Sequence, residues 1–245
     1  MGTARTIQSV RRRQRTWRLA AAATIFPAAV SLQVLQAGPA CAVGCDPVSA
    51  GGTGLTRYQS ANVYLGSAAV ITRDDPFICG SNYLSAAWVG IQGNNYGEFA
   101  QIGWVEYNGF PNRYFYWLGT GSVVFIANLP DTQTWKGDSF SVAQGLGSPN
   151  QVYMFMTTNE GSSYSYTVNK AVNPTMAEWL GEVQHLQTQS PGRTSAKTHF
   201  TNARKYYNGQ WWNQIINSAD LHSDLWFQAK SSSGGDDFYI WDSRF

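Results

Sequence analysis

Apolar, β-branched and aromatic residues occur along this chain in short runs that are separated by Gly, Asn, Ser and Pro. Runs of this length and composition are typical of β-strands. The expected strands are Asn62–Ile71, Ala86–Ile91, Phe99–Tyr107, Tyr114–Leu118, Ser122–Ala127, Ser139–Ala143, Gln151–Thr158, Ser163–Val168, Met176–Leu186, Ala196–Ala203, Leu225–Lys230 and Phe238–Trp241. A helical turn is expected only near Trp212–Ser218.

Many short strands with frequent turns favour an all-β protein, a two-sheet antiparallel sandwich of the concanavalin-like jelly-roll type. Glu160-Gly161 and Asn208-Gly209 are typical hairpin turns between flanking strands. No low-complexity or charged run divides the chain. We therefore expect one domain over residues 43–245, with an aromatic-rich C-terminal extension after about residue 203.

The first 42 residues have the order of a secretory signal peptide. Arginines cluster between Arg11 and Arg18, an apolar run extends from Leu19 to Val30, and small residues end at Ala42. A membrane anchor needs roughly 18 or more uninterrupted apolar residues, and Pro27 interrupts this run. The sequence thus predicts a secreted protein, with residues 1–42 removed and no stable membrane anchor.

Removal of the leader changes both the cysteine count and the charge. Cleavage after Ala42 removes Cys41 and leaves Cys45 and Cys79, which predicts one disulfide in an oxidising compartment; two unrelated buried thiols are the alternative. The whole chain has 17 basic and 15 acidic residues, and the leader holds six arginines and no acid. The remaining 11 basic residues give a net charge of −4, so we expect no binding of nucleic acid or anionic lipid.

The common catalytic motifs are absent from the sequence. There is no Gly-x-Ser-x-Gly, His-Glu-x-x-His, phosphate-binding loop or Cys-x-x-Cys. The three histidines, His185, His199 and His222, do not share metal-ligand spacing on one element. We therefore expect neither a metal nor a cofactor.

Two polar residues lie within strongly apolar strands. Strict alternation in Met176–Val183 places Ala177 and Trp179 toward the core and Glu178 on the opposite face. The same argument in Phe99–Trp104 leaves Gln101 outside the core. A partly desolvated carboxylate can act as a general base, and a neutral amide can stabilise an oxyanion. Each residue can also be an ordinary polar residue of a solvated strand.

Four blocks of the sequence, in order and at similar spacing, resemble the eqolisins, or glutamic peptidases, a family of secreted β-sandwich endopeptidases. Ala87-Trp88-Val89-Gly90-Ile91-Gln92-Gly93 is similar to the family's Ala-Trp-Val-Gly-Ile-Asp-Gly, and Gln101-Ile102-Gly103 to its Gln-Thr-Gly. Ala177-Glu178-Trp179 matches its Ala-Glu-Trp, and Phe200-Thr201-Asn202-Ala203 matches its Phe-Thr-Asn-Ala.

The resemblance implies that Glu178 is the general base and that Gln101 orients the water and stabilises the oxyanion. The chain also departs from the family. Tyr114-Phe115-Tyr116-Trp117 stands where the family has Trp-x-Glu-Trp, so a supporting carboxylate is missing, and Gln92 replaces an aspartate. About forty residues after Ala203 exceed the family core, and no recognisable inhibitory propeptide precedes the first strand.

Two hypotheses for the function follow. The first is an acid-acting endopeptidase that uses Glu178 and Gln101 on a polypeptide substrate. The second is a non-catalytic module that binds an extracellular glycan or a polypeptide through an aromatic surface of Trp88, Tyr114 and Tyr116. A glycoside hydrolase using Glu178 and Glu182 is disfavoured, because residues four apart on a strand lie roughly 13 Å apart, beyond the spacing that either glycosidase mechanism needs.

Overall fold

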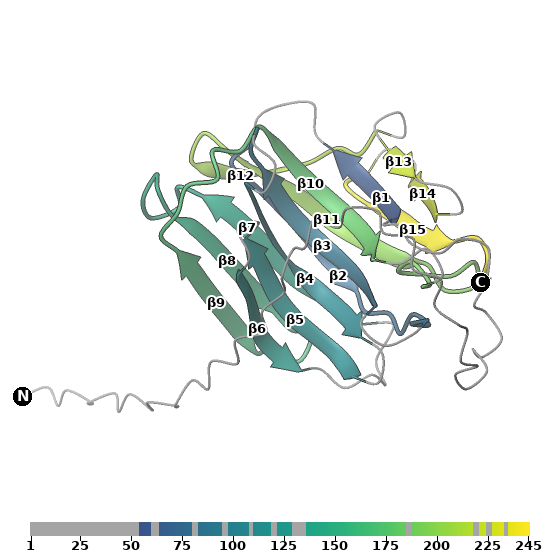
Figure 1. The fold of residues 1–245 in the computed structure, drawn as a ribbon. Helices are drawn as coiled ribbons and strands as arrows, with labels where there is room; N and C mark the ends of the chain where they lie inside the picture. The colour runs from purple at the N-terminus through teal and green to yellow at the C-terminus, as the bar shows by residue number, and fades with distance from the viewer. Residues whose placement is uncertain are drawn as a thin grey trace, which may run out of the picture. The chain divides into compact units, whose positions relative to one another are not determined.

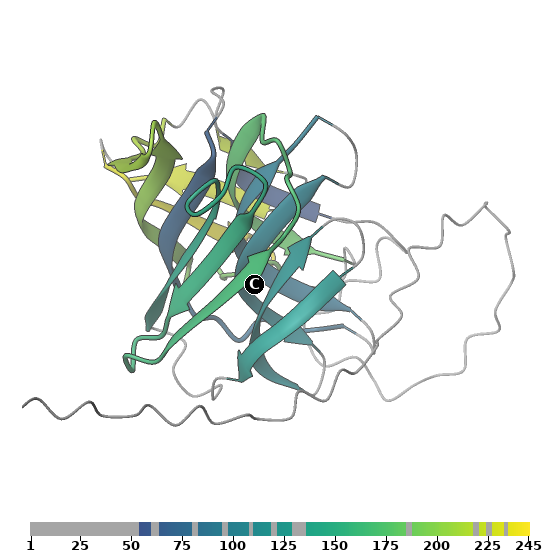
Figure 2. The same ribbon diagram turned by 90° about the vertical axis from the view of Figure 1, so that its left-hand side faces the viewer.

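Two antiparallel sheets, packed face to face, form the fold in the computed structural model (Figures 1 and 2). The structure describes residues 54–59, 64–79, 83–94, 98–107, 110–118, 122–128, 136–184, 188–217, 221–223, 227–232 and 235–245. The predicted leader, Cys45 and His185 lie outside these residues. The predicted all-β sandwich is confirmed.

The first sheet has seven strands in the order β13 (Leu221–Ser223), β1 (Gly54–Gln59), β10 (Met176–Val183), β3 (Leu84–Gln92), β4 (Phe99–Tyr107), β5 (Phe110–Leu118) and β6 (Ser122–Asn128). The second has the order β14 (Phe227–Ser231), β15 (Phe238–Asp242), β11 (Thr198–Tyr207), β2 (Gly66–Thr72), β7 (Gly137–Gln144), β8 (Val152–Thr157) and β9 (Ser163–Val168). Its eighth strand, β12 (Gln210–Asn213), pairs with β11.

The core lies between the sheets, and both contribute large side chains to it. Ala87, Val89, Ile102, Trp104 and Trp179 come from the seven-stranded sheet, and Ile71, Phe140, Met154, Phe200 and Ile240 from the eight-stranded sheet. These residues alternate along their strands with residues of the opposite face, as a pleated strand requires. The side chains that alternate with these residues therefore lie on the outer faces of the two sheets.

Both predicted hairpins are present. Asn208 and Gly209 have φ values of 51° and 77° and join β11 to β12, the positive φ at both central positions that a tight hairpin turn favours. Glu160 and Gly161 lie in the loop between β8 and β9, where Gly161 has a φ of 89°.

The helical turn predicted near Trp212–Ser218 is wrong. Trp212 and Asn213 belong to β12, and the described residues after them are irregular, with Gln214 donating to Ala203 O and Ile216 to Gly235 O. The backbone bonds of this segment go to distant residues instead of to its own preceding turn. Strands β1, β12 and β13 were not predicted, because each is short or lacks a clear alternating pattern.

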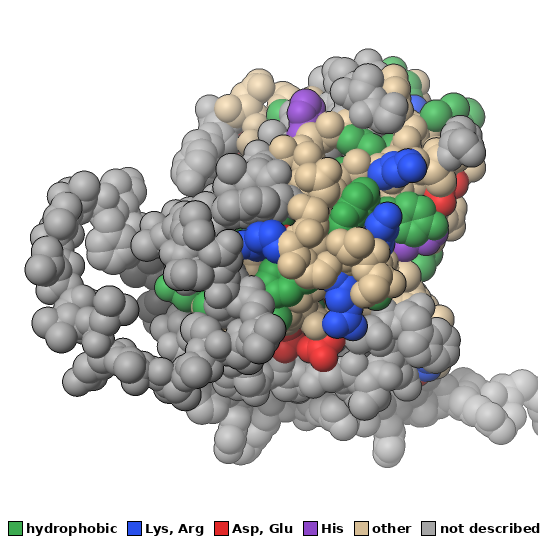
Figure 3. Space-filling model, turned by 90° about the vertical axis from the view of Figure 1, so that its right-hand side faces the viewer, with side chains coloured by type: hydrophobic (Ala, Val, Ile, Leu, Met, Phe, Trp, Pro, Cys, Tyr) green, Lys and Arg blue, Asp and Glu red, His purple; other side chains and the backbone are tan. Residues whose placement is uncertain are grey.

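The residues after 203 are part of the sandwich. Strands β14 and β15 extend the eight-stranded sheet beside β11, and β13 extends the other sheet beside β1. His199 on β11 stacks on Tyr239 on β15 with ring centroids 3.9 Å apart, and Nζ of Lys197, just before β11, lies 4.0 Å from the ring centroid of Trp241 on β15. Figure 3 shows that basic side chains on this side of the molecule are separated by apolar and neutral ones.

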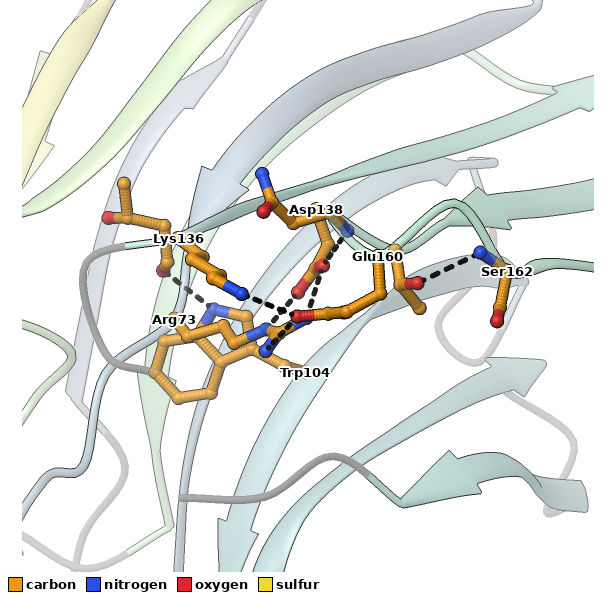
Figure 4. Close-up of polar contacts among 9 residues, drawn as sticks. Arg73, Trp104, Lys136, Asp138, Glu160 and Ser162 are labelled. Atoms are coloured by element: carbon orange, nitrogen blue, oxygen red, sulfur yellow. Dashed lines mark hydrogen bonds and ion pairs between the residues drawn. The ribbon is translucent and has the colours of Figure 1, made fainter. Parts of the chain in front are cut away.

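A network of ion pairs closes one end of the eight-stranded sheet (Figure 4). The buried Arg73 guanidinium donates from Nε and Nη2 to the two Asp138 carboxylate oxygens, at 2.7 and 2.8 Å. Arg73 and Lys136 also donate to Glu160, in the β8–β9 loop. These bonds lower the pKa of Glu160 to about 2. The network ties the segment after β2 to β7 and to this hairpin.

Within the described ranges, no helix has the length and apolar character needed to cross a membrane.

Candidate active site

Glu178 and Gln101 belong to the same sheet and to the same cross-strand row. Glu178 on β10 pairs with Gly90 on β3, and Gly90 pairs with Gln101 on β4. Directly opposed residues of antiparallel strands project from the same face. Two strand spacings separate the backbones of Glu178 and Gln101, roughly 10 Å at about 4.8 Å each. The row therefore holds a carboxylate and an amide on either side of a residue without a side chain.

This row lies on the outer face of the seven-stranded sheet. On β10, Ala177 and Trp179 belong to the core between the sheets, so Glu178 projects outward. On β4, Ala100 and Ile102 belong to the same core, so Gln101 also projects outward. The alternation expected for both segments is confirmed. Glu178 is nonetheless only 5% exposed, so its carboxylate is largely desolvated.

Gly90 leaves space that Gln101 uses. A Cβ atom at Gly90 would lie 3.1 Å from Gln101 Cγ and 3.9 Å from its Nε2. The Gln101 side chain therefore leans across Gly90 toward β10, the strand of Glu178. A side chain at position 90 would stand between the carboxylate and the amide.

The backbone beneath this row is fixed to the opposite sheet. Ser67 Oγ on β2 donates a 2.7 Å hydrogen bond to Gly90 O, and Trp179 Nε1 donates a 2.8 Å bond to Ala68 O. On β4, Trp104 Nε1 donates to Thr72 O at 3.0 Å. Each of the three strands of the row is thus joined to β2 by a side-chain bond. Such bonds keep rigid the backbone on which a site must be built.

Trp88 lies next to this row and is buried. It pairs with Leu180 on one side and Gly103 on the other, and it forms a small apolar cluster with Leu180, Ala86, Val105 and Leu84. Trp88 is 1% exposed. A stacking surface for sugars must present its ring to solvent, so this burial does not support the predicted role of Trp88 in an open aromatic surface.

Glu182 lies on the same outer face, two positions beyond Leu180. Burial raises the pKa of Glu182 above its usual value, and the charge of Glu178 raises it further. The neighbouring Trp88 side chain acts in the opposite direction and lowers this pKa. The two carboxylates are therefore electrostatically coupled although their backbones lie four residues apart.

The register of β5 differs from what the predicted aromatic surface requires. Tyr114 pairs with Trp104 and Tyr116 with Ile102, which are core-facing positions of β4, whereas Gln101 pairs with Trp117. The side chains of β5 lie outside the described part of the structure, so the roles of Tyr114 and Tyr116 stay predictions. By register, Trp117 is the β5 residue of the Glu178–Gln101 row.

The described histidines lie away from this row. His199 Nε2 on β11 lies 3.0 Å from Asp237 Oδ2, just before β15. A hydrogen bond from Ser232, together with the His199 contact, lowers the pKa of Asp237. His222 lies on β13. Among the residues that the structure describes, no group of three or more His, Cys, Asp or Glu could hold a metal ion.

No protein-family model and no curated protein matches the sequence. Solved structures do match. Two crystal structures of Scytalido-glutamic peptidase with transition-state analogues align with a TM-score of 0.58 and 14% identity, over 78% of this chain and 98% of the peptidase. The chain has the eqolisin fold. SCP-B, a member of the eqolisin family in complex with the tripeptide Ala-Ile-His, aligns over the same shares of both chains with a TM-score of 0.57 and 14% identity.

Three of the four sequence blocks lie side by side in the seven-stranded sheet, and the fourth lies in the other sheet. Three of them form the adjacent strands β3, β4 and β10, which carry the Glu178–Gly90–Gln101 row. The fourth lies in the other sheet, on β11, where Phe200 and Ala203 are in the core and Asn202 has a φ of 53° at a bulge. That block therefore shapes a strand and does not contribute to the row.

Sequence reasoning missed one residue of this row. Gly90 is part of a block that resembles the family, but only the strand register shows that it separates Glu178 from Gln101. The alternation of Met176–Val183 already predicts that Glu182 shares the face of Glu178.

Proposed function

We propose that this chain is a secreted endopeptidase of the glutamic type, with Glu178 as general base and Gln101 as the stabiliser of the oxyanion. The observation that carries the proposal is the Glu178–Gly90–Gln101 row on the outer face of an eqolisin-like sheet. The lean of Gln101 across Gly90 and the burial of Glu178 support it, because hydrolysis needs both groups to reach one water.

In this mechanism the ionised Glu178 removes a proton from water as the water oxygen bonds to the carbonyl carbon of the peptide. The Gln101 amide donates a hydrogen bond to the oxygen that becomes negatively charged. Glu178 then returns the proton to the leaving nitrogen as the carbon–nitrogen bond breaks. Partial burial favours this chemistry, because hydrogen bonds to a developing charge are stronger away from water.

The proposal is tested by substitution at both positions in the secreted protein. Glu178→Gln is nearly isosteric but cannot accept the proton, so hydrolysis of casein or haemoglobin at roughly pH 3 to 6 should be abolished. Gln101→Ala should lower kcat by on the order of 10² to 10³, the usual effect of deleting an oxyanion donor. Circular dichroism and the melting temperature should match those of the unsubstituted protein.

Full activity of Glu178→Gln with an unchanged fold would exclude this mechanism. An unsubstituted protein that is inactive across this pH range would instead favour the second hypothesis, a module that binds a glycan or a polypeptide without hydrolysing it.

A further inference from the structure

We propose that the outer face of strands β14, β15 and β11 binds an acidic segment of an extended polypeptide. This surface belongs to the eight-stranded sheet, whereas the Glu178–Gly90–Gln101 row lies on the outer face of the seven-stranded sheet. The two sheets pack face to face, so their outer faces point in opposite directions (Figure 2). The inference therefore goes beyond the proposed peptidase function and does not depend on it.

Two cross-strand rows form this surface, each with an aromatic ring on β15 between polar residues of β14 and of β11 or the residue just before it. From β14 across the sheet, the rows are Lys230–Tyr239–His199 and Gln228–Trp241–Lys197. Phe238 and Ile240 belong to the core between the sheets, so Tyr239 and Trp241 project outward. The rows lie about 7 Å apart, because alternate residues of a strand are separated by two rises of about 3.3 Å.

The rings of these rows have a face covered by a neighbouring side chain. The Tyr239 ring stacks on His199 of the adjacent strand, with ring centroids 3.9 Å apart and an interplanar angle of 10°. Rings on strands about 4.8 Å apart stack in this way when they stand upright on the sheet, with their edges outward. The Lys197 ammonium covers a face of the Trp241 ring. Ring edges carry partial positive charge, so they favour contact with carboxylates over the face-to-face stacking of sugars.

The charge of this surface is complementary to an acidic partner. Lys197 and Lys230 are exposed, and among the described side chains neither forms an ion pair with an acid. The described acid of this face, Asp237, lies 3.0 Å from His199 Nε2 instead. After removal of the predicted leader, the chain has 11 basic and 15 acidic residues. The surface therefore differs in sign from the molecule as a whole.

An extended polypeptide also matches the spacing of the two rows. Alternate side chains of an extended chain project to the same side and lie about 7 Å apart, as the two rows do. Acidic residues at alternate positions can therefore pair with Lys230 in one row and Lys197 in the other, because both ammonium groups are carried on long, flexible side chains. The upright rings between the lysines complete a surface for carboxylates.

The test is fluorescence anisotropy at about pH 6, where glutamates are ionised, with a labelled synthetic peptide that alternates Glu and Thr. The protein carries Glu178→Gln, so that hydrolysis does not consume the probe. This peptide should bind more tightly than one with Gln in place of Glu, and added salt should weaken its binding by screening exposed charges. Lys197→Glu and Lys230→Glu should each weaken binding by roughly 3- to 30-fold, since a surface attraction becomes a repulsion. The matched control is Lys170→Glu, which makes the same charge change after β9, at the opposite edge of this sheet, and should have little effect.

Conservative variants and a second probe complete the experiment. Lys197→Arg and Lys230→Arg keep the charge and should bind the Glu peptide within about twofold of the parent protein. Equal affinity for the Glu and Gln peptides, or equal effects of the three Lys→Glu variants, would overturn the proposal. Binding of polygalacturonate without binding of the Glu peptide would also overturn it, because the surface would then recognise a glycan. Because no hydrolysis is measured, an unsubstituted protein without peptidase activity would refute the proposed function and leave this inference standing.

Discussion

At the scale of single residues, a glycine is the most informative member of the proposed site. Gly90 is where β3 passes between Glu178 and Gln101, and its backbone is fixed by Ser67 in the opposite sheet. Its role is therefore to leave space over a rigid strand. Glu178 on β10 and Gln101 on β4 are separated by β3, so a side chain at position 90 would occupy the space between them. In the proposed mechanism, that space is where the water binds.

This role predicts the result of Gly90→Ala. The new Cβ would lie 3.1 Å from Gln101 Cγ, tighter than an ordinary van der Waals contact, so Gln101 must move away from β10. Gln101 must give by a few tenths of an ångström, so kcat should fall, by less than the roughly 10²-fold that a 1 Å misplacement can cost, with little change in KM. The measurement is steady-state kinetics alongside a melting curve. The control is Gly147→Ala in an exposed loop, where the new Cβ would meet only Gln151 Oε1 at 3.6 Å. Equal kinetics for the two variants would contradict the role given to Gly90.

At the scale of elements, the sequence predicted strands well where alternation was strict. In β10 and β4 the period of two identified the core-facing residues correctly, because both strands are buried on one face by the opposite sheet. The prediction of a helical turn at Trp212–Ser218 failed at β12, because the Asn208-Gly209 turn brings Trp212 back along β11. The pairing register between strands could not be predicted from the sequence either, although a shift of one residue moves every side chain of a strand to the other face. The placement of Tyr114 and Tyr116 depended on that register.

The segment that follows β2 carries the predicted disulfide. Cys79 is buried at the end of this segment, and the pairing with Cys45 stays a prediction because Cys45 lies outside the described residues. Protein purified after the proposed secretion and removal of residues 1–42 should contain no alkylatable thiol when mass spectrometry is performed without reduction. Cys45→Ser and Cys79→Ser should each lower the unfolding free energy by about 2 to 4 kcal/mol, since the link closes a loop of the unfolded chain. Two reactive thiols in freshly secreted protein would refute the pairing.

At the scale of the whole molecule, the stability of the fold depends on pH through a buried acid, Asp74. Asp74 lies just after β2 and accepts a hydrogen bond from Gly192 N, which joins two loops that are distant in sequence. Burial raises the pKa of Asp74 to about 6 from 3.8, although the Gly192 bond and the charge of Arg193 act in the opposite direction. Glu160 differs, because its ion pairs with Arg73 and Lys136 favour its charged form. Because Asp74 in the folded protein keeps its proton up to about pH 6, this group stabilises the fold at acidic pH, the range proposed for the activity.

Asp74→Asn tests this link between pH and stability. Because the folded state binds the Asp74 proton more tightly than the unfolded chain, the stabilisation is fully present below about pH 4 and is lost as the pH rises through about 6. A shift of this size corresponds to on the order of 3 kcal/mol. Asn keeps an oxygen that can accept from Gly192 N but does not titrate, so urea unfolding between pH 4 and 7 should show a smaller loss of stability for Asp74→Asn than for the unsubstituted protein. The exposed neighbour provides the control, and Asp75→Asn should follow the unsubstituted curve more closely. If Asp74→Asn loses as much stability as the unsubstituted protein over this range, Asp74 is ionised throughout it, and the acid preference of the fold must come from other groups such as Glu182.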